Sequence, residues 1–382
     1  MSTETNKGVL NDYAFYVNEH ITVSSLDENH YFSTENMLPN RGGVCRATSL
    51  PEQEKVVRVE AGDILISNIR PYFKKIWLAK ELAGCSNDVL CIRAKSMCLP
   101  EFLFYYLSSD IFFDYVMTGA KGTKMPRGDK QQILHFHMLI PSLDIQKQVI
   151  SILSCIDKKI QLNTQINQNL EQQAQAIFKS WFVDFEPFGG SIPSDWVEIS
   201  FGAFLKPRSE KSNDVSIPLF SVTDTGIYPR DEKFNKKLSK STTKNKIAYS
   251  TDIIFGMSRE ILNWGIMRAP IGCVSSAYNV YSVSDMVNSK YLESFIKSHS
   301  QSFQDLIGPA SREGQGIDKA ALLAKTIYLP TNDVLTNYYA IEDALTETIK
   351  IHESENKRLI LLRDTLLPKL MSGEIDVSEV DV

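Results

Sequence analysis

The stretch Ala61-Gly-Asp-Ile-Leu-Ile-Ser67 returns 189 positions later as Ser250-Thr-Asp-Ile-Ile-Phe-Gly256. Further pairs follow at the same offset: Arg70 and Arg259, Gly119 and Gly308, Asp129 and Asp318, Pro141 and Pro330, Leu170 and Leu359. An offset maintained from about residue 61 to residue 180 is the signature of an internal duplication. The sequence therefore predicts a chain built from two copies of one unit.

Each copy has the same predicted order of elements. Short β-rich runs come first, then a short amphipathic helix, a glycine-containing loop with a second short helix, a strand ending in proline, and a long helix. The β-rich runs are predicted at 56–59, 63–66, 252–255 and 278–283. The helices are predicted at about 100–116, 128–134 and 143–182 in the first copy and 289–306, 317–324 and 332–371 in the second.

These segments predict an α+β fold class with two mixed α/β domains. Two long antiparallel coiled-coil helices should separate the domains, and an internal pseudo-two-fold repeat should relate them. The expected boundaries are 1–142 for the first domain, 143–182 for the first helix, 183–193 for a breaker-rich linker, 194–331 for the second domain, 332–372 for the second helix and 373–382 for a tail.

Both long helices carry apolar residues at steps of three and four, with polar residues in the middle of the series. The expected seam consists of Val149, Ile152, Ile156, Ile160, Asn163, Asn167, Leu170 and Ile177 in the first helix, and Tyr338, Ile341, Leu345, Ile349, His352, Asn356, Leu359 and Leu366 in the second. Because both midpoints are polar, we expect antiparallel pairing within one chain, with Asn163 near Asn356 and Asn167 near His352. Pro368 and Gly373 mark the expected end of the second helix.

Charge and composition limit the functional classes to which the chain can belong. The 382 residues carry a net charge of −5, but residues 333–382 hold 11 acidic and 5 basic side chains, so the remainder is close to neutral. A nucleic-acid site would therefore have to come from local basic loops. The sequence contains no apolar run long enough to span a bilayer, which predicts a soluble, cytoplasmic protein without membrane contact.

The sequence offers little for catalysis. It contains no phosphate-binding Gly-x-x-x-x-Gly-Lys-Ser/Thr loop, no Gly-x-Ser-x-Gly elbow and no Pro-Pro of the kind found in amino-methyltransferase motifs. The six cysteines form no C-x-x-C pair, and the six histidines have no metal-ligand spacing. We therefore expect no catalytic residue, no metal site and no cofactor in this chain.

Basic and polar loops are the chemistry that the sequence does offer. Arginine and lysine suit phosphates and guanine edges, and asparagine and glutamine suit adenine edges. The candidate DNA-binding residues are Asn68, Arg70, Lys121, Thr123, Lys124, Arg127 and Lys130 in the first copy and Ser258, Arg259, Asn263, Ser311, Arg312, Gln315 and Lys319 in the second. For any single one, a solvated surface loop is the simpler interpretation. Both copies contain a glycine-flanked polar loop at this position, which favours a DNA-binding role for residues 119–130.

Two weaker groups of cations accompany these candidates. Lys74 and Lys75 follow Arg70 closely in the first copy. The basic run 230–246 in the second copy is better explained as a surface loop with some phosphate contact; its cations are Arg230, Lys233, Lys236, Lys237, Lys240, Lys244 and Lys246.

The layout resembles the specificity subunit of type I restriction–modification enzymes over nearly the whole chain. The resemblance rests on the long-helix stretches Gln146-Lys-Gln-Val-Ile150 and Ala176-Ile-Phe-Lys-Ser-Trp-Phe182, and on the ending Leu366-Leu-Pro-Lys-Leu-Met-Ser-Gly-Glu-Ile375. Gly62-Asp-Ile-Leu65 and Asp252-Ile-Ile-Phe-Gly-Met-Ser-Arg259 also look like that family's recognition domains. The second copy opens with Pro193-Ser-Asp-Trp196, a common domain start in the family, whereas the first copy has no equivalent tryptophan.

The resemblance implies two target-recognition domains that read the halves of a split, asymmetric site on double-stranded DNA. It implies that the helices pair as a spacer and bind two methyltransferase subunits and motor-nuclease subunits. S-adenosylmethionine, ATP and Mg are then expected on the partner subunits, because the family's specificity subunit has no catalytic centre of its own.

Two other classes remain open at this stage. A coiled-coil scaffold without DNA contact would suit the negative net charge. A stand-alone DNA methyltransferase is disfavoured by the missing motifs, and S-adenosylmethionine binding by the isolated chain would test it.

Overall fold

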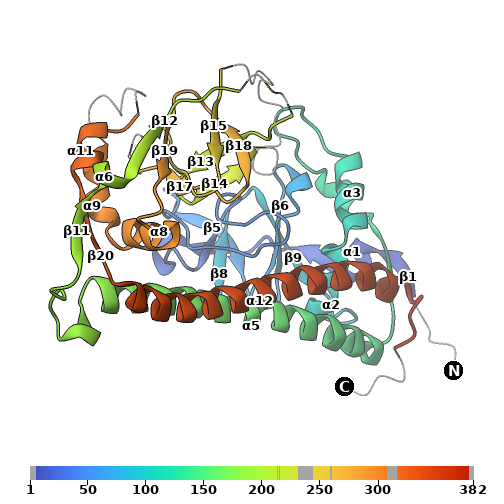
Figure 1. Cartoon of the computed structure of the whole chain (residues 1–382). Coiled ribbons are helices and arrows are strands. Elements are labelled where there is room, and N and C mark those ends of the chain that lie inside the picture. Colours follow the sequence, from blue (N-terminus) through green and yellow to red (C-terminus); the bar gives the residue numbers. More distant parts are fainter. Residues whose placement is uncertain are drawn as a thin grey trace. The chain divides into compact units, whose positions relative to one another are not determined.

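The computed structural model describes residues 6–212, 214, 216–230, 244–258, 260–307 and 316–377. The chain forms two compact units: unit 1 comprises Met1–Gln165 and Ile351–Val382, and unit 2 comprises Ile166–Lys350. The long helices α5 (Leu143–Phe182) and α12 (Asn332–Ser372) contribute residues to both units (Figure 1). Their observed ends match the predicted domain boundaries 143–182 and 332–372.

A four-stranded antiparallel sheet forms the centre of unit 1, in the order β2 (Ala14–Tyr16), β9 (Val89–Ala94), β6 (Ile64–Ser67), β7 (Ile76–Leu78). All four residues of β6 are buried, which explains their continuous apolar sequence. The core beside this sheet includes the fully buried Phe102 and Phe112. Unit 1 is therefore a mixed α/β domain with its own hydrophobic core.

Unit 2 repeats this sheet. Its order is β12 (Leu205–Arg208), β19 (Asn279–Val283), β16 (Ile253–Phe255), β17 (Trp264–Ile266). The two sequence stretches that revealed the duplication thus become β6 and β16, which hold the same place in equivalent sheets. This agreement confirms the internal repeat at the level of sheet topology.

Both copies bury the aspartate of the repeated stretch in an ion pair. Asp63 accepts hydrogen bonds from Arg93 at 2.7 and 2.8 Å, and Asp252 accepts them from Arg208 at 2.7 and 3.2 Å. A buried carboxylate requires such a partner because it has lost its hydration. The arginines occupy non-equivalent strands, β9 in unit 1 and β12 in unit 2.

The other strands complete each unit. In unit 1, β1 (Asn6–Val9) pairs with β10 (His137–Ile140), and a second sheet has the order β3 (His20–Thr22), β5 (Lys55–Val59), β8 (Ala83–Cys85), β4 (Tyr31–Phe32). In unit 2, the pairs are β11 (Val197–Ser200) with β20 (Thr326–Leu329), β13 (Phe220–Thr223) with β14 (Gly226–Pro229), and β15 (Lys246–Tyr249) with β18 (Ile271–Val274).

Short helices connect the sheets, and two predicted helices are each interrupted. Residues 100–116 form α2 (Pro100–Leu107) and α3 (Asp110–Thr118), because Ser109 leaves the helical conformation and its Oγ caps the Phe112 N–H at 3.3 Å. Residues 289–306 form α8 (Ser289–Ser298), α9 (Ser300–Phe303) and the 3₁₀ turn η4 (Gln304–Leu306). The other helices and 3₁₀ turns are α1 (Leu10–Tyr13), α4 (Lys130–Leu134), α6 (Phe201–Phe204), α11 (Lys319–Ala324), η1 (Val23–Ser25), η2 (Pro71–Phe73) and η3 (Glu186–Phe188).

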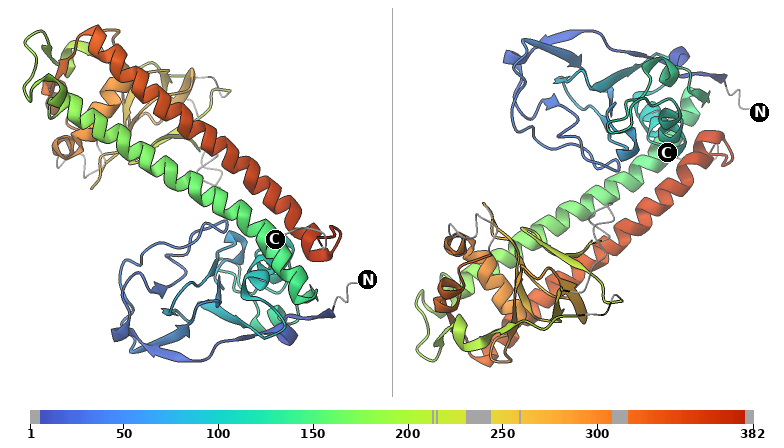
Figure 2. Two further views of the ribbon diagram at one scale, coloured as in Figure 1. Left: turned by 90° about the horizontal axis from the view of Figure 1, so that it is seen from below. Right: turned by 90° about the horizontal axis from the view of Figure 1, so that it is seen from above.

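Within each unit the local stretches of α5 and α12 lie side by side and run in opposite directions (Figure 2). In unit 1, Asn163 Nδ2 donates to Asn356 Oδ1 at 2.9 Å, and Arg363 donates to Asp157 at 2.9 Å. In unit 2, Asn167 Nδ2 donates to the Ile349 carbonyl at 3.3 Å. The predicted approach of Asn163 to Asn356 is confirmed.

Several seam positions need correction. Ile341 is 38% exposed, while Glu342 is half-buried, and burial raises the pKa of Glu342. The next residue after Tyr338 on the buried face of the helix therefore lies four positions on, at Glu342, and not three positions on, at Ile341. Leu153, which the prediction omitted, is fully buried beside the partly buried Ile152. Pro368 lies inside α12, and the helix ends at Ser372 before Gly373, whose φ of +73° suits a helix C-terminus.

Candidate nucleic-acid interface

A strained turn follows β6 in unit 1. Arg70 and Lys74 flank the 3₁₀ turn η2 and both adopt the left-handed conformation, with φ of 52° and 50°. Non-glycine residues in this region cost on the order of 1–3 kcal/mol each, and such strain concentrates at functional sites. The turn therefore places the half-buried Arg70 at the end of a central strand, in a conformation that the chain maintains at a cost.

The loop 119–130 packs against this turn. The Arg70 N–H donates to the Pro126 carbonyl at 2.8 Å, and Ile69 forms a β-bridge with Arg127. Lys121 and Arg127 exchange two backbone hydrogen bonds of 2.9 Å, which closes the loop on itself. Two candidate clusters that lie about 50 residues apart in the sequence thus form one surface, called here the turn–loop surface (residues 68–74 and 119–130).

The side chains of this surface are available to a ligand. Lys121, Thr123, Lys124, Arg127 and Lys130 are all exposed. Lys121 pairs with Asp129 at 2.9 Å, which lowers the pKa of that carboxyl group, and Arg127 pairs with Asp88 at 3.0 Å. Exposed ion pairs contribute only about 0–1 kcal/mol, so a phosphate can displace either carboxylate at little cost.

Two polar groups beneath the surface lack a hydrogen-bond partner among the described residues. They are Asn68 Oδ1, in a residue only 8% exposed, and Arg70 Nε. A Cβ at Gly128 would approach Asn68 Oδ1 to 2.9 Å, so glycine is needed for the loop to pack this closely. Buried polar atoms of this kind normally bind a partner, and a nucleic acid on the surface would supply one.

Neighbouring cations of the first copy have structural roles. Lys74 pairs with Asp110 at 2.8 Å, and Lys75 Nζ donates to the Thr34 carbonyl at 2.6 Å. Burial lowers the pKa of Lys75. These two lysines stabilise the turn more than they extend the candidate interface.

In unit 2 the candidates divide differently. Ser258 is fully buried, and its Oγ accepts a hydrogen bond from the Asn263 N–H at 2.8 Å, so the prediction that it contacts DNA is wrong. Asn263 Nδ2 donates a hydrogen bond to the Met257 carbonyl at 2.6 Å within the same turn. Lys319 is exposed at the first position of α11. The remaining candidates lie outside the described residues: Arg259, Ser311, Arg312 and Gln315, together with Lys233, Lys236, Lys237 and Lys240 of the basic run.

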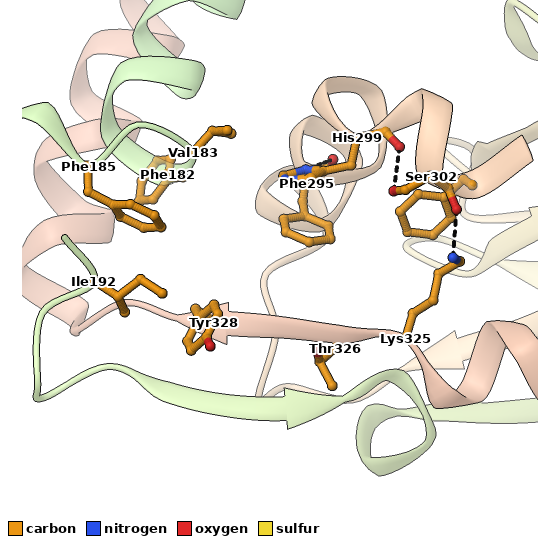
Figure 3. Close-up of a pocket in the computed structure, with 11 residues that line it drawn as sticks. Phe182, Val183, Phe185, Ile192, Phe295, His299, Ser302, Lys325, Thr326 and Tyr328 are labelled. Atoms are coloured by element: carbon orange, nitrogen blue, oxygen red, sulfur yellow. Dashed lines mark hydrogen bonds between the residues drawn. The ribbon is translucent and has the colours of Figure 1, made fainter. Parts of the chain in front are cut away.

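A hollow of about 360 Å³ in unit 2 is a different kind of surface (Figure 3). Aromatic side chains dominate its lining, including Phe182 and Phe295. The amine of Lys325 is already engaged by the Ser302 carbonyl at 2.6 Å and by Asp305. The hollow therefore presents no free cation to a phosphate.

Two features are absent from the described part of the chain: a metal-binding cluster and a membrane-spanning helix. Over the described residues, no three or more His, Cys, Asp or Glu side chains gather closely enough to hold a metal ion. None of the helices in the described part of the chain is both long and apolar enough to cross a membrane.

Comparison with known families identifies the first copy. Residues 31–172 match the family model described as the type I restriction modification DNA specificity domain. The matched segment makes up less than half of the chain. The match includes β6, the turn–loop surface and most of α5, which are the elements that assemble the candidate interface.

Curated relatives of the specificity domain carry consistent names. The HindI specificity subunit of Haemophilus influenzae is 36% identical over 41% of this chain and 36% of its own length. That match thus spans about a third of the relative. The MjaIX specificity subunit of Methanocaldococcus jannaschii is 25% identical over 84% of this chain and 79% of its own length.

Solved structures share the fold. A chain from a study of complex assembly and conformational transition in a type I R-M system is 16% identical, with a TM-score of 0.55, over 98% of this chain and 99% of that one. The type I restriction-modification S subunit from M. genitalium is 12% identical, with a TM-score of 0.54, over 97% and 96%. At these identities the likeness establishes the mixed α/β fold with its long helices.

Proposed function

We propose that this protein is the non-catalytic specificity subunit of a type I restriction–modification complex. It reads a bipartite, asymmetric site on double-stranded DNA. It directs two adenine methyltransferase subunits and the motor-nuclease subunits to that site in the cytoplasm. S-adenosylmethionine, ATP and Mg act on those partners, and this chain contributes recognition alone.

The observation that carries this proposal is the duplication of one scaffold beneath different surfaces. Each unit has the same central sheet and the same buried aspartate, Asp63 or Asp252. The residues above that sheet differ in part: the buried Asn68, with its unpartnered Oδ1, follows β6 where the same offset places the exposed Met257 after β16, although Arg70 and Arg259 match. Two recognition domains that share one fold but differ in surface residues suit two different DNA half-sites.

The arrangement of the domains is part of the proposal. Target-recognition domains at 1–142 and 194–331 are related by a pseudo-two-fold axis, and α5 and α12 form the spacer between them. Support comes from the antiparallel contacts within each unit, including the pair Asn163–Asn356. Polar groups at a helix seam select register, which a spacer of fixed length needs.

Within the first domain the turn–loop surface contacts DNA. Lys121, Lys124 and Lys130 bind phosphates, because flexible ammonium groups act as point charges. Arg70 and Arg127 suit guanine edges, and Asn68 and Thr123 add polar contacts. The unpartnered Asn68 Oδ1 and Arg70 Nε support direct contact at this turn.

Methylome sequencing of cells with and without the gene tests the function. The expected result is an adenine-methylated, two-part motif that is present only with the gene. Replacing the exposed loop residues Lys121, Thr123 and Lys124 by serine should disturb the motif at one half-site only, while the other half-site is kept. A methylome that does not depend on the gene would refute the proposed function.

A further inference from the structure

Three lysines lie close together in unit 2, and none of them has an ion-pair partner within the described residues. Lys211 and Lys246 stand directly opposite each other in an antiparallel β-bridge, and Lys319 begins α11 nearby. Burial, followed by the positive charges of Lys319 and Lys211, lowers the pKa of Lys246. Like charges directly opposite each other on neighbouring strands are destabilising, so the chain maintains this arrangement at a cost.

The neighbouring carboxylates are engaged elsewhere. Glu210 accepts a hydrogen bond from the Tyr249 hydroxyl at 3.2 Å, and Asp318 caps α11 by accepting from the Ala321 N–H at 2.9 Å. Within the described part of the chain, none of the three lysines forms an ion pair with a carboxylate. Among the described residues, Lys246 Nζ donates to the Tyr278 carbonyl, at 2.6 Å, and to no carboxylate.

The equivalent ladder of unit 1 carries no pair of lysines. The offset of 189 places Val57 at the position of Lys246, and equivalent hydrogen bonds support this match. The N–H groups of the next residues, Arg58 and Ile247, donate to the carbonyls of Glu19 and Glu210 at 2.8 and 2.9 Å. In unit 1 the residue opposite Val57 is His20, so a histidine–valine pair stands where unit 2 has two lysines.

Two of the three lysines are open to solvent. Lys211 and Lys319 are exposed, and Lys246 is half-buried. Unit 1 closes the equivalent ladder with His20 and Val57, so the ladder itself does not require two lysines. Exposed ammonium groups beside a third lysine fit an anionic ligand.

We propose that Lys211, Lys246 and Lys319 form a phosphate-binding site of unit 2, called here the lysine triad, which binds the DNA backbone. This inference rests on the proposed function. Three neighbouring cations suit successive phosphates of a duplex, and bound phosphate removes the mutual repulsion of the lysines. Lys211, which the repeat pattern alone did not single out, becomes a contact residue.

The test measures how salt weakens DNA binding. The complex of the full chain with its methyltransferase partners is titrated with a mixed-sequence 30-base-pair duplex at several NaCl concentrations, for wild type, Lys211→Gln and Lys319→Gln. Each lost phosphate contact should flatten the slope of log K against log [NaCl] by about 0.9. Both side chains are exposed, so the variants should fold.

Lys297→Gln is the matched control. It removes the same charge from α8 of the same unit, where Lys297 is already paired with Glu293 at 2.9 Å. The slope of this control should stay at the wild-type value. A slope that flattens equally in the control would mean that net charge, and not the triad, governs binding.

A second measurement needs no DNA. Because Lys211→Gln relieves the repulsion on Lys246, it should raise the melting temperature of the free protein while weakening duplex binding. Unchanged slopes in both triad variants, with sequence-specific methylation intact, would overturn the lysine triad alone. A wild-type complex that binds no duplex would overturn the proposed function as well.

Discussion

The buried ion pair of Asp63 and Arg93 makes a quantitative prediction, because its two partners are unequally buried. The Asp63 side chain is 1% exposed and that of Arg93 is 22% exposed. Arg93 also reaches Glu60 at 3.1 Å and Glu19 at 3.6 Å, whereas Asp63 has no second cation within the described residues. Removing the arginine should therefore destabilise unit 1 more than removing the carboxylate charge.

The magnitudes follow from what each variant leaves behind. Arg93→Met leaves a buried, uncompensated carboxylate and should cost about 3–5 kcal/mol. Asp63→Asn leaves an arginine that is still paired with Glu60 and should cost about 1.5–3 kcal/mol, the range for a hydrogen bond to a charged group. The double variant should cost less than the sum, because neither charge then remains without its partner.

Tryptophan positions allow this to be measured for unit 1 alone. Of the four tryptophans, only Trp77 lies in unit 1, and it pairs with Leu65 in the strand beside Asp63. Urea titration of 5-fluorotryptophan-labelled protein, followed by ¹⁹F NMR, reports the unfolding of each unit separately, with the Trp77 signal assigned by Trp77→Phe. If Asp63→Asn destabilised the Trp77 signal as much as Arg93→Met, burial would not be the deciding factor.

Three further outcomes are expected. Lys124→Ala and Arg127→Ala should weaken DNA binding: a lost phosphate contact flattens the slope of log K against log [NaCl] by about one unit, and a lost base contact costs ~1–3 kcal/mol. Both variants should disturb methylation at one half-site only. Equal loss at both half-sites would contradict two independent recognition domains. Four residues inserted after Asn169 add roughly 6 Å of helix, which corresponds to one or two base pairs at ~3.4 Å each. The methylome should therefore show the same half-sites with a gap longer by one or two base pairs. An unchanged gap with full activity would show that helix length does not set the distance between the half-sites. Asn163→Leu combined with Asn356→Leu should raise the melting temperature in calorimetry but relax the seam register, and a lower melting temperature would argue against this.

The duplication and the long helices could be read from the sequence because both are periodic. A constant offset places Asp63 on Asp252, and the step of three and four over 40 residues fixes α5 and α12 to within a residue of their predicted ends. The same periodicity predicted that Asn163 faces Asn356, which the 2.9 Å hydrogen bond confirms. It failed at Ile341, where one step of four turns the face toward Glu342.

The candidate interface could be predicted only in part. Residue type selected the turn at Arg70 and the loop around Arg127, but not their contact, because a β-bridge between distant segments leaves no local pattern. Residue type also misassigned Ser258, since a hydroxyl group serves a ligand and a buried turn equally well. Helix breaks such as Ser109 depend on a single capping hydrogen bond, which periodicity does not register.

What the sequence determined by itself was the repeated unit, its long helices and the polar middle of their seam, because each follows from spacing along the chain. The tertiary structure alone decided which cations are free. Sheet order gives Asp63 an arginine from β9 and Asp252 one from β12, and it places Lys211 opposite Lys246 where unit 1 has His20 opposite Val57. Strand pairing brings together residues far apart in sequence, and the charge that a residue presents depends on those neighbours.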